Sequence, residues 1–378
     1  MRFGSSLFFG NYKDWDRFFA LEAGQTVPEP EVSDGQIWRE ELELAVLSDE
    51  LGFDTFWTQE QHGAPYLMSP DPHVLMAYLA GRTKKIDFGS SITVLPWHDP
   101  FRVAEQISVF SHMIGDRRYF LGVGRGSAAR NFDAMSIPME ESRERFNEVL
   151  DVLQLAFTKE IFSYEGKFFT YKNVSLRPRP RDPQVVIDAL GAWTSHASLV
   201  NMAERGLHPI TTPNQTLDSY LDEMEEFNQI RVEKGYGISN RPVIKIPMYC
   251  SESGQEATES AEQHFFEFVD AVQNMYEIGT DRFGTAKGYE DYHGERGSDF
   301  GKGTAEDARR VLTRKFMTEG VYGTPQQCVD KLIAHLESVN PSEYIALCRC
   351  GDMPYEKAER SMRLFAQEVL PKVRAQFP

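Results

Sequence analysis

The chain has 378 residues, 41% of them hydrophobic, so it can bury one large core or two ordinary ones. Its formal net charge of −17 argues against nucleic acid or an anionic membrane surface as a general partner. No apolar run approaches the roughly 18 residues that cross a membrane. The beginning of the chain lacks a signal-peptide pattern, and the four cysteines form neither a CxxC pair nor a zinc-binding spacing. These features predict a cytoplasmic protein.

Short apolar runs alternate along the chain with segments in which apolar residues recur at helical spacing. The runs predict eight strands, at Arg2–Phe9, Thr55–Thr58, Ile86–Val94, Arg118–Val123, Val185–Asp188, His208–Thr211, Val243–Tyr249 and Tyr344–Leu347. The segments between them predict helices at Ile37–Leu51, Asp71–Arg82, Arg102–Met113, Met139–Phe157, Ser195–Glu204, Leu217–Lys234, Gly254–Met275, Pro325–His335 and Tyr355–Arg374. The alternation predicts a single domain over 1–378, a (β/α)₈ TIM barrel with insertions. A doubly wound open sheet is the main alternative.

Three stretches do not fit the simple alternation. The polar, Pro-containing segment Asn11–Gln36 is expected to be a loop above the sheet. The segment Phe162–Leu176, which turns at Glu165-Gly166, is expected to be an inserted hairpin. Gly279–Gly303 is rich in Gly, Asp and Tyr without a clear period, which predicts a long mobile loop before the last helix–strand units.

The stretch from Ile86 to Gly126 organises the rest of the chain, because it is a complete strand–helix–strand unit of a parallel sheet. The second strand ends in Gly124-Arg125-Gly126. Glycines allow a ligand to approach the backbone, and the arginine places one fixed cation beside it. The unit therefore predicts an anion site at the carboxyl edge of the sheet, although the sequence GVGRG lacks the dinucleotide fingerprint.

Other candidate side chains follow neighbouring strands. Glu60-Gln61-His62 follows the second strand, and His62 is a candidate proton donor, although a plain polar loop would have the same composition. Gly89–Ile92 either admits a flat ligand or allows tight packing of the barrel. The hydroxyls of Thr194, Ser195 and Ser198 open a helix, where they could bind phosphate or simply cap the helix. Arg143, at the start of its helix, is most simply a solvated charge.

These residues lie in longer segments that occur in a fixed order: ELGFDTFWTQEQHG, RTKKIDFGSSITVLPWHDPFRVAEQ, YFLGVGRG, MEESRE, RGSDFGKG, GTPQQCVDKL and RLFAQEVLP. With them, the chain resembles the bacterial luciferase-like monooxygenase family nearly from end to end. RGSDFGKG and the helix that begins at GTPQQC are similar to the luciferase alpha chain in particular.

The resemblance implies a (β/α)₈ barrel that binds reduced FMN supplied by a separate flavin reductase. It implies an oxidoreductase that activates O₂ as a flavin C4a-hydroperoxide and oxygenates a small apolar or aromatic organic substrate. It also implies a homodimer that associates through the helices near Asp71–Arg82 and Pro100–Gly115, with small side chains such as Ala80 and Ala104 at the contact. By position, the phosphate set of the family corresponds to Arg125, Arg143, Thr194, Ser195 and Ser198. The peptide Ser91-Ile92 corresponds to a non-proline cis bond under the flavin ring.

Two departures from the luciferase pattern bear on the reaction. Gln61 stands where luciferases have the first histidine of Glu-His-His, and an amide is not a general base at neutral pH. The resemblance therefore implies a monooxygenase that is not a true luciferase. Gly124 stands where luciferase alpha chains carry a reactive cysteine. Within the resemblance, Glu60, Gln61 and His62 are the candidate catalytic residues, and Lys302 in the 279–303 loop would reach toward the flavin.

Two rival functions remain open at the level of the sequence. A deazaflavin-dependent dehydrogenase or reductase on the same barrel would bind a longer anionic cofactor, and Arg130 is the one added basic residue near Arg125. A non-catalytic flavin-binding partner is the other rival. The aromatic residues Phe8, Phe9, Trp57, Tyr66 and Trp97 favour an apolar or aromatic substrate, although each could equally belong to the core.

Overall fold

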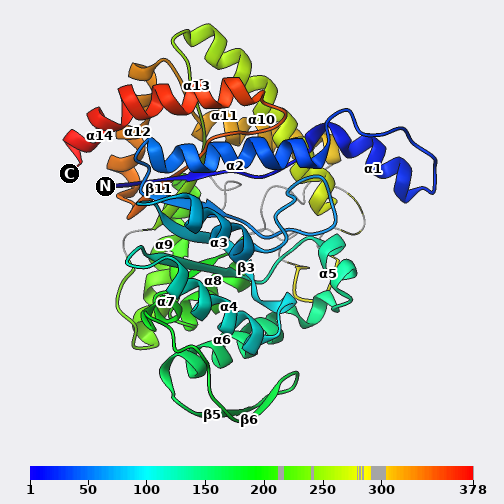
Figure 1. Ribbon diagram of the computed structural model, residues 1–378, viewed down its shortest axis with the longest axis vertical. Helices are drawn as coiled ribbons and strands as arrows, with labels where there is room; N and C mark the ends of the chain where they lie inside the picture. Colours follow the sequence, from blue (N-terminus) through cyan, green and yellow to red (C-terminus); the bar gives the residue numbers. More distant parts are fainter. Residues whose placement is uncertain are drawn as a thin grey trace.

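A closed parallel barrel is the centre of the computed structural model, which describes residues 1–211, 217–239, 242–278, 280, 282, 285–290 and 304–377 (Figure 1). The described strands form one parallel sheet in the order β10-β9-β11-β1-β2-β3-β4-β7-β8, and β8 pairs again with β9 through Ile210 and Val243. Eight strands thus close a ring, and β10 extends β9 outside it. The predicted TIM barrel is confirmed.

The bounds of the strands and helices are as follows. The strands are β1 (Arg2–Ser6), β2 (Thr55–Thr58), β3 (Asp87–Val94), β4 (Tyr119–Gly124), β5 (Phe162–Glu165), β6 (Thr170–Val174), β7 (Leu190–Ala192), β8 (His208–Ile210), β9 (Val243–Cys250), β10 (Val321–Gly323) and β11 (Glu343–Leu347). The helices are α1 (Trp15–Glu22), α2 (Asp34–Glu50), α3 (Pro72–Arg82), α4 (Pro100–Met113), α5 (Ala129–Met135), α6 (Ser142–Thr158), α7 (Gln184–Ile187), α8 (His196–Glu204), α9 (Leu217–Glu233), α10 (Gly254–Tyr276), α11 (Ala305–Glu319), α12 (Pro325–Val339), α13 (Tyr355–Leu364) and α14 (Leu370–Gln376).

The local sequence accounts for where several helices begin. Asp71 and Asp99 each accept two backbone N–H bonds at the start of α3 and α4, and a proline occupies the first turn of both helices. Thr324 and Gln327 form a reciprocal capping box at the start of α12, which agrees with the predicted Thr-Pro start. These caps set the points at which the chain turns from a strand into the covering helix.

One predicted strand is wrong. Residues 185–188 were expected to be a strand, but Gln184–Ile187 form the short helix α7, and the strand that follows β4 in the ring is β7, Leu190–Ala192. Proline at position 183 precedes α7, where it can occupy the start of a helix. The run Val185-Val186 is apolar because α7 packs against the core, so hydrophobicity alone does not separate the two structures.

The segment expected to be a loop above the sheet, Asn11–Gln36, contains α1, and α2 begins within it at Asp34. Figure 1 shows α1 and the chain that follows it projecting to one side of the barrel. The hairpin over Phe162–Leu176 is confirmed as β5 and β6. Most of the predicted 279–303 loop, including Lys302, lies outside the described residues, and 285–290 is its longest described piece.

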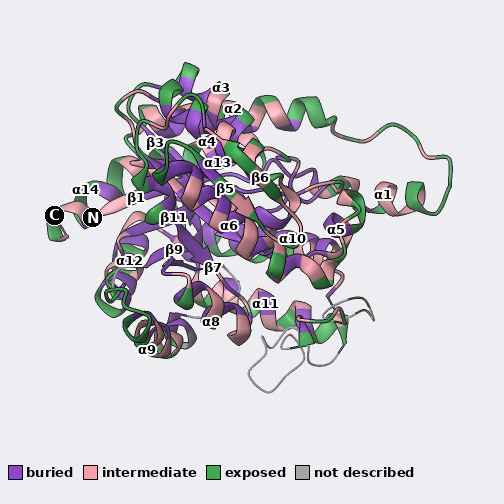
Figure 2. Ribbon diagram, turned by 90° about the horizontal axis from the view of Figure 1, so that it is seen from below, coloured by how far each residue is buried: buried purple, intermediate pink, exposed green. Residues whose placement is uncertain are grey.

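The barrel interior is filled at the end where the strands begin. Trp57, Leu190, Ile210, Val243 and Ile345 form a buried apolar cluster there. Beside it, the Trp57 indole N–H donates to Glu343 at 2.8 Å, and Arg2 bonds the same carboxylate at 3.0 Å. Figure 2 shows that the buried residues, in purple, lie mostly on the barrel strands in the middle of the molecule. Because this end is packed, a ligand site can lie only toward the carboxyl ends of the strands.

The four cysteines, Cys250, Cys328, Cys348 and Cys350, are buried free thiols, in line with the absence of a disulfide framework in the sequence. Among the described residues, every helix is too short or too polar to traverse a lipid bilayer.

Candidate active site at the carboxyl ends of the strands

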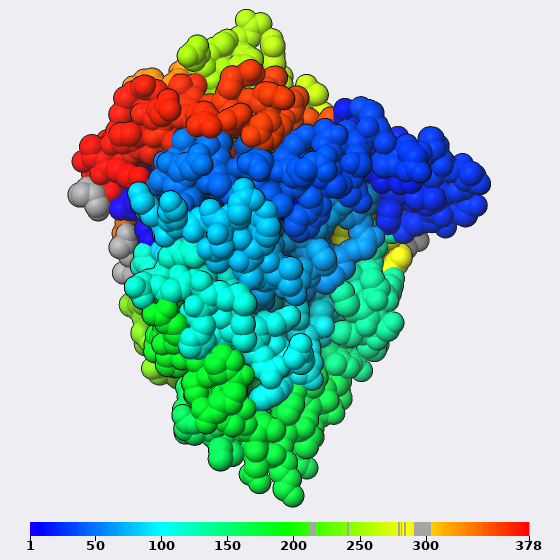
Figure 3. Space-filling view, in the orientation of Figure 1, coloured from blue at the N-terminus to red at the C-terminus, as the bar shows by residue number. Residues whose placement is uncertain are grey.

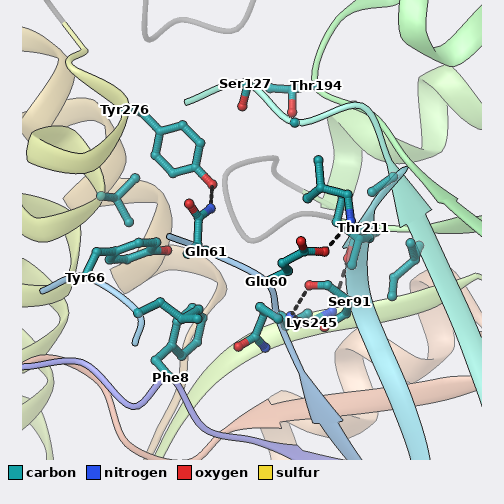
Figure 4. A pocket seen from close by; sticks show the side chains of 18 of the residues that line it. Phe8, Glu60, Gln61, Tyr66, Ser91, Ser127, Thr194, Thr211, Lys245 and Tyr276 are labelled. Carbon is teal, nitrogen blue, oxygen red and sulfur yellow. Dashed lines mark hydrogen bonds between the residues drawn. The ribbon is translucent and has the colours of Figure 1, made fainter. Parts of the chain in front are cut away.

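A cavity of about 200 Å³ opens above the packed end of the barrel (Figure 4). Its wall combines residues from seven strands of the ring and the loops that follow them, from Phe8 after β1 to Lys245 of β9. The polar part includes Gln59, Glu60 and Gln61 after β2, Ser91 of β3, Arg125 and Ser127 after β4, Thr194 after β7, Thr211 after β8 and Lys245 of β9. The cavity therefore lies at the edge of the sheet where the sequence predicted a site.

Arg125 is a buried cation in this wall. Its Nη1 donates to the Gly288 carbonyl at 2.8 Å, and its guanidinium lies 3.8 Å from the centre of the Tyr289 ring. Tyr289 in turn donates to the Gly126 carbonyl at 2.8 Å and contacts the Ser142 hydroxyl at 2.9 Å. Among the described residues, no carboxylate forms an ion pair with Arg125. A buried cation without a carboxylate partner suits an anionic ligand.

The amino end of α8 supplies the hydroxyl groups. Thr194 and Ser198 line the cavity, and the Ser195 hydroxyl donates to Ser198 Oγ at 3.1 Å. Ser195 occupies the N-cap position, yet its side chain makes no capping bond. Hydroxyls and free backbone N–H groups at a helix N-terminus bind phosphate well.

Arg143 belongs to the same corner through α6. Its Nη1 donates to the Ala197 carbonyl at 2.6 Å, in the first turn of α8. Farther along the two helices, Asn201 donates to Asn147 at 3.2 Å, and Arg205 pairs with Asp151. These contacts recur every turn and fix α8 against α6. Arg143 is not a solvated charge, although its side chain does not line the cavity itself.

Ser91 and Ile92 form part of the cavity wall, and the peptide bond between them is cis, as the resemblance implied. The small residues before them have a different role. A Cβ on Gly89 would lie 2.3 Å from the Trp57 ring, so Gly89 serves packing of the barrel. A Cβ on Gly124 would lie 2.0 Å from Ile92 Cδ1, so any side chain at 124 requires Ile92 to move.

Glu60 is the centre of a buried hydrogen-bond cluster beside the cavity. Its carboxylate accepts from the Val94 N–H at 2.7 Å and bonds the ring Nε2 atoms of His98 at 2.9 Å and His62 at 3.1 Å. Burial acts to raise the pKa of Glu60, but the His98 charge and these hydrogen bonds outweigh it and lower that pKa to about 2. In return, although burial opposes it, the Glu60 carboxylate raises the pKa of His98.

His62 is therefore tethered to the cavity wall without being part of it. Its ring bonds Glu60 and packs edge-on against Trp97 at 5.2 Å between ring centres. Glu60 and Gln61 do line the cavity. His98, which the sequence analysis did not select, shares Glu60 with His62; its position four residues beyond the β3 strand was the available signal.

Gln61 has both ends of its amide occupied. It donates to the Tyr276 hydroxyl at 2.8 Å, and it accepts from the Asn131 amide. Asn131 also accepts from the His62 backbone N–H at 3.3 Å. The chain of contacts fixes the orientation of Gln61 and presents the Tyr276 hydroxyl to the cavity, which Tyr276 lines. Gln61 thus positions its neighbours, and its amide cannot accept a proton at neutral pH.

The side of the cavity nearest α10 and α11 is apolar. Tyr66 and Phe268 pack there around Phe8, with ring centres 4.7 Å apart for Phe8 and Phe268. Of the aromatic residues singled out in the sequence, Phe8, Tyr66 and Trp97 line the cavity, whereas Phe9 and Trp57 belong to the core. The cavity therefore has a polar side and an apolar side.

Lys245 is the charged residue of the described wall that the sequence did not point to, beside the uncharged Gln59, Ser127 and Thr211. It is the third residue of β9, is only 4% exposed, and donates from Nζ to Ser91 Oγ at 2.5 Å and to the Ser91 carbonyl at 3.3 Å. Burial lowers its pKa to about 7. The signal in the sequence was a lysine inside the otherwise apolar strand VIKIPMYC.

The predicted site residues thus fall into three groups. Glu60, Gln61, Ser91, Ile92, Arg125, Thr194 and Ser198 line one cavity. His62, Gly124, Arg143 and Ser195 contact that wall from behind. Lys302 lies outside the described residues. The catalytic and cofactor-binding roles of all these residues stay predictions.

Comparison with known proteins agrees with the fold. Residues 19–341 match the model of the luciferase-like monooxygenase family. The alkanal monooxygenase alpha chain of Photorhabdus laumondii is 25% identical over 357 residues, which cover 92% of this chain and 95% of that protein.

Solved structures share the barrel at lower identity. The monooxygenase RslO1 from Streptomyces bottropensis superimposes with a TM-score of 0.76 at 24% identity, over 98% of this chain and 99% of that chain. The oxygenating constituent of 3,6-diketocamphane monooxygenase from Pseudomonas putida, solved with FMN, gives 0.71 at 19% identity and 99% coverage of both chains. The F420-dependent tetrahydromethanopterin reductase of Methanopyrus kandleri gives 0.64 at 17% identity, over 98% of this chain and 99% of that chain.

Proposed function

We propose that this chain, which belongs to the luciferase-like monooxygenase family and is a flavin-dependent monooxygenase, uses reduced FMN from a separate flavin reductase to oxygenate a small apolar or aromatic organic substrate. The single observation that carries the choice of cofactor is the buried cation Arg125, which lacks a carboxylate partner among the described residues and shares one cavity with Thr194 and Ser198.

The residues present fit FMN on chemical grounds. One phosphate needs fixed positive charge and several donors, and Arg125, the α8 hydroxyls and the α8 N-terminus supply them. Arg143 positions this corner through its bond to Ala197. Reduced FMN, when bound, supplies the reaction with O₂. The task left to the protein is to bind, orient and exclude water.

Each side of the cavity has a separate role in this proposal. The apolar side around Phe8, Tyr66 and Phe268 takes the organic substrate, and the Tyr276 hydroxyl, held by Gln61, gives it one hydrogen-bond partner. The Glu60 carboxylate favours the protonated form of His98 and holds the His62 ring behind the cavity wall, where His62 is the proposed hydrogen-bond or proton donor. The 279–303 segment is proposed to be the lid.

The experiment that tests the proposal supplies reduced FMN and air and measures oxygen uptake, hydrogen peroxide and incorporation of labelled oxygen into a panel of aromatic and alicyclic compounds. A monooxygenase transfers one atom of ¹⁸O₂ to a product. Flavin binding with peroxide as the sole product from every compound would favour a non-catalytic flavin-binding partner. Failure to bind reduced FMN would contradict the proposal outright.

A deazaflavin-dependent dehydrogenase is the second candidate, because solved relatives of this fold use F420. A longer anionic tail would need added positive charge near Arg125. Arg130, the candidate for that role, forms ion pairs with Glu22 at 2.5 Å and Glu277 at 3.7 Å, which supports FMN over the longer cofactor. Titration with both cofactors under anaerobic conditions separates the two functions.

We also propose a homodimer in the cytoplasm that meets the reductase only through exchange of free flavin. The small residues expected at the dimer contact, such as Ala80 and Ala104, are buried inside the molecule. The same helices α3 and α4 instead expose Val74, Tyr78, Val109 and Met113. These four side chains are the apolar surface that supports pairing of two copies.

A further inference from the structure

Lys245 forms part of the floor of the cavity and has no role in the proposed function as stated above. Figure 4 shows it beside Ser91, at the opposite side of the cavity from Ser127 and Thr194. Its amine contacts the Ser91 hydroxyl and the carbonyl of the cis peptide bond. In the orientation that satisfies both ends of its amide, Gln59 accepts from Lys245 Nζ at 2.9 Å. The two N–H groups of the uncharged amine serve Gln59 and the Ser91 carbonyl, and its lone pair can accept from the Ser91 hydroxyl.

The partners of this amine are all uncharged. Among the described residues, no carboxylate forms an ion pair with Lys245, and the centre of the Phe8 ring lies 5.9 Å from Nζ. The other titratable side chains of the cavity wall are Glu60, Tyr66, Arg125 and Tyr276. Glu60 is directed at Val94 and the two histidines, and Arg125 at Gly288, so neither compensates a charge on Lys245.

A buried amine that lacks a counter-ion responds to the charge of whatever enters the cavity. The burial that lowers the pKa of Lys245 to about 7 leaves it largely uncharged slightly above neutral pH. An anion beside Lys245 raises its pKa again, because the charged ammonium then gains a partner of opposite charge. The ring system of oxidised FMN is neutral, whereas that of reduced FMN is an anion near and above neutral pH.

We propose that Lys245 binds the ring of reduced FMN as its counter-ion, and that it takes up a proton from solvent when that ring enters the cavity. The proposal rests on the proposed function, because it needs FMN with its phosphate at the Arg125 and α8 side. Uptake converts the uncharged amine into an ammonium, and no electron passes through the lysine. When a neutral oxidised ring replaces the anion, the ammonium returns the proton to solvent.

The consequence is selection between two redox states of one cofactor. An enzyme that receives free reduced FMN must bind it in the presence of the oxidised form that the reaction regenerates. The phosphate is the same in both forms, so Arg125 cannot distinguish them. Lys245 becomes charged only when an anionic ring lies beside it. This charge favours binding of reduced FMN, and its absence speeds release of oxidised FMN.

The test is anaerobic calorimetry of reduced and oxidised FMN at about pH 8, repeated in two buffers that differ in ionisation enthalpy. At this pH the reduced ring is already anionic in solution. We expect uptake of close to one proton per reduced FMN and little uptake with oxidised FMN. The preference for reduced FMN should fall about tenfold to a hundredfold in Lys245→Met, with loss of the proton uptake.

Two further variants make the result decisive. Lys245→Arg carries a permanent charge, so it should keep the preference for reduced FMN but lose the proton uptake. Lys172→Met removes an exposed lysine of the β5–β6 hairpin and should change neither quantity. Circular dichroism confirms that each variant is folded, and the proton uptake of the parent chain tests the idea without any substitution.

The outcomes separate this inference from the function on which it rests. If the parent binds reduced FMN tightly without taking up a proton, and Lys245→Met keeps the preference, the role of Lys245 is refuted while the monooxygenase proposal stands. If the parent binds neither form of FMN, the proposed function fails and this inference fails with it.

Discussion

Arg125 connects the cavity to 285–290, the described piece of the predicted lid. Its guanidinium is shared between the Gly288 carbonyl and the face of Tyr289. Arg125→Ala should weaken FMN binding by about 1.5–3 kcal/mol, the range for a charge-assisted hydrogen bond. Fluorescence titration with FMN measures the change. Arg102→Ala, which removes an exposed arginine paired with Glu105, is the matched control and should bind FMN as the parent does.

Glu60 should make stability depend on pH in a defined window. Its folded pKa of about 2 lies below the ordinary 4.5, so its contribution is present above pH 4.5 and is lost as pH falls toward 2. The pKa of His98 is raised above its ordinary 6.5. The stability that comes from the charged His98 imidazolium is therefore complete below pH 6.5 and is lost as the pH rises through the raised pKa.

Glu60→Gln should therefore lower the free energy of unfolding most between about pH 4.5 and 6.5, by on the order of 3 kcal/mol. Urea denaturation at several pH values measures this difference, which should shrink toward pH 2. Glu165→Gln, at the exposed hairpin turn, is the control. A Glu60→Gln effect that stays constant from pH 2 to pH 6 would show that the carboxylate charge is irrelevant.

Gln61 leads to a prediction about light. An amide held by Tyr276 and Asn131 cannot take the place of an imidazole base, so the protein should consume O₂ with reduced FMN and a long-chain aldehyde but emit no useful light. A luminometer assay coupled to a flavin reductase, with a true luciferase as the positive control, measures this. Emission comparable to the luciferase would contradict the assignment of Gln61.

At the level of single residues, the sequence located the cavity because small, polar and basic residues follow strand ends, where parallel strands converge. Lys245 does not stand out in the sequence, because it is the third residue of β9 and has none of the small or polar neighbours that mark a strand end. The sequence also could not show that Gly89 packs against Trp57 while Ser91 lines the cavity, since the two residues share one face of β3 and differ only in their position along the barrel axis.

Among elements, the described piece of the predicted lid, 285–290, makes a specific contact with the barrel. Tyr289 joins it to Gly126 and Ser142 through one hydroxyl and covers Arg125 with its ring. Tyr289→Phe should keep the ring contact and lose the hydroxyl bonds, whereas Tyr289→Ala should lose both. Each lost contact should let more water reach the flavin site. The peroxide released per NADH consumed in the coupled assay should therefore rise from the parent to Tyr289→Phe and again to Tyr289→Ala.

Tyr164→Phe removes a tyrosine hydroxyl from the β5–β6 hairpin and serves as the control for these two variants. Equal peroxide release from the parent, Tyr289→Phe and Tyr289→Ala would show that this segment does not exclude water.

Long amphipathic elements were the most predictable. Helices α3, α4, α8, α10 and α12 lie within three residues of their predicted starts, because caps and apolar stripes mark them. Predictions of short elements failed where a helix and a strand share one composition. The helix α7 was predicted as a strand, and the three-residue strand β7 that follows it was not predicted. The helix α11 was not predicted, since its strongly polar sequence buries only Ala308, Leu312 and Phe316.

At the scale of the whole molecule, the surface of α3 and α4 should be the dimer contact. Both helices lie on the face seen in Figure 3, where residues 72–113 are coloured light blue to cyan. Val74 is 66% exposed and Met113 55% exposed, and the helices α3 and α4 that carry them pack against each other. Exposed apolar side chains on two packed helices favour a subunit contact. Val74→Glu combined with Met113→Lys should convert a dimer into a monomer at micromolar concentration in sedimentation velocity.

Ile161→Lys is the matched control, because Ile161 is 64% exposed before the hairpin and far from α3 in the sequence. It should leave the sedimentation coefficient unchanged. A parent chain that sediments as a monomer at micromolar concentration would remove the basis for the dimer.

The pairing of β1 with β11 places a constraint on how the protein is made. Arg2 and Glu343 pair across 341 residues of chain, both as register partners in the sheet and as an ion pair. At roughly 5–20 residues per second, a ribosome delivers β11 about 17–70 s after β1. Throughout that time β1 has one unpaired edge that can accept a strand from another chain. Slower translation in the second half of the message should therefore lower the soluble yield, and a chaperone that covers β1 should restore it.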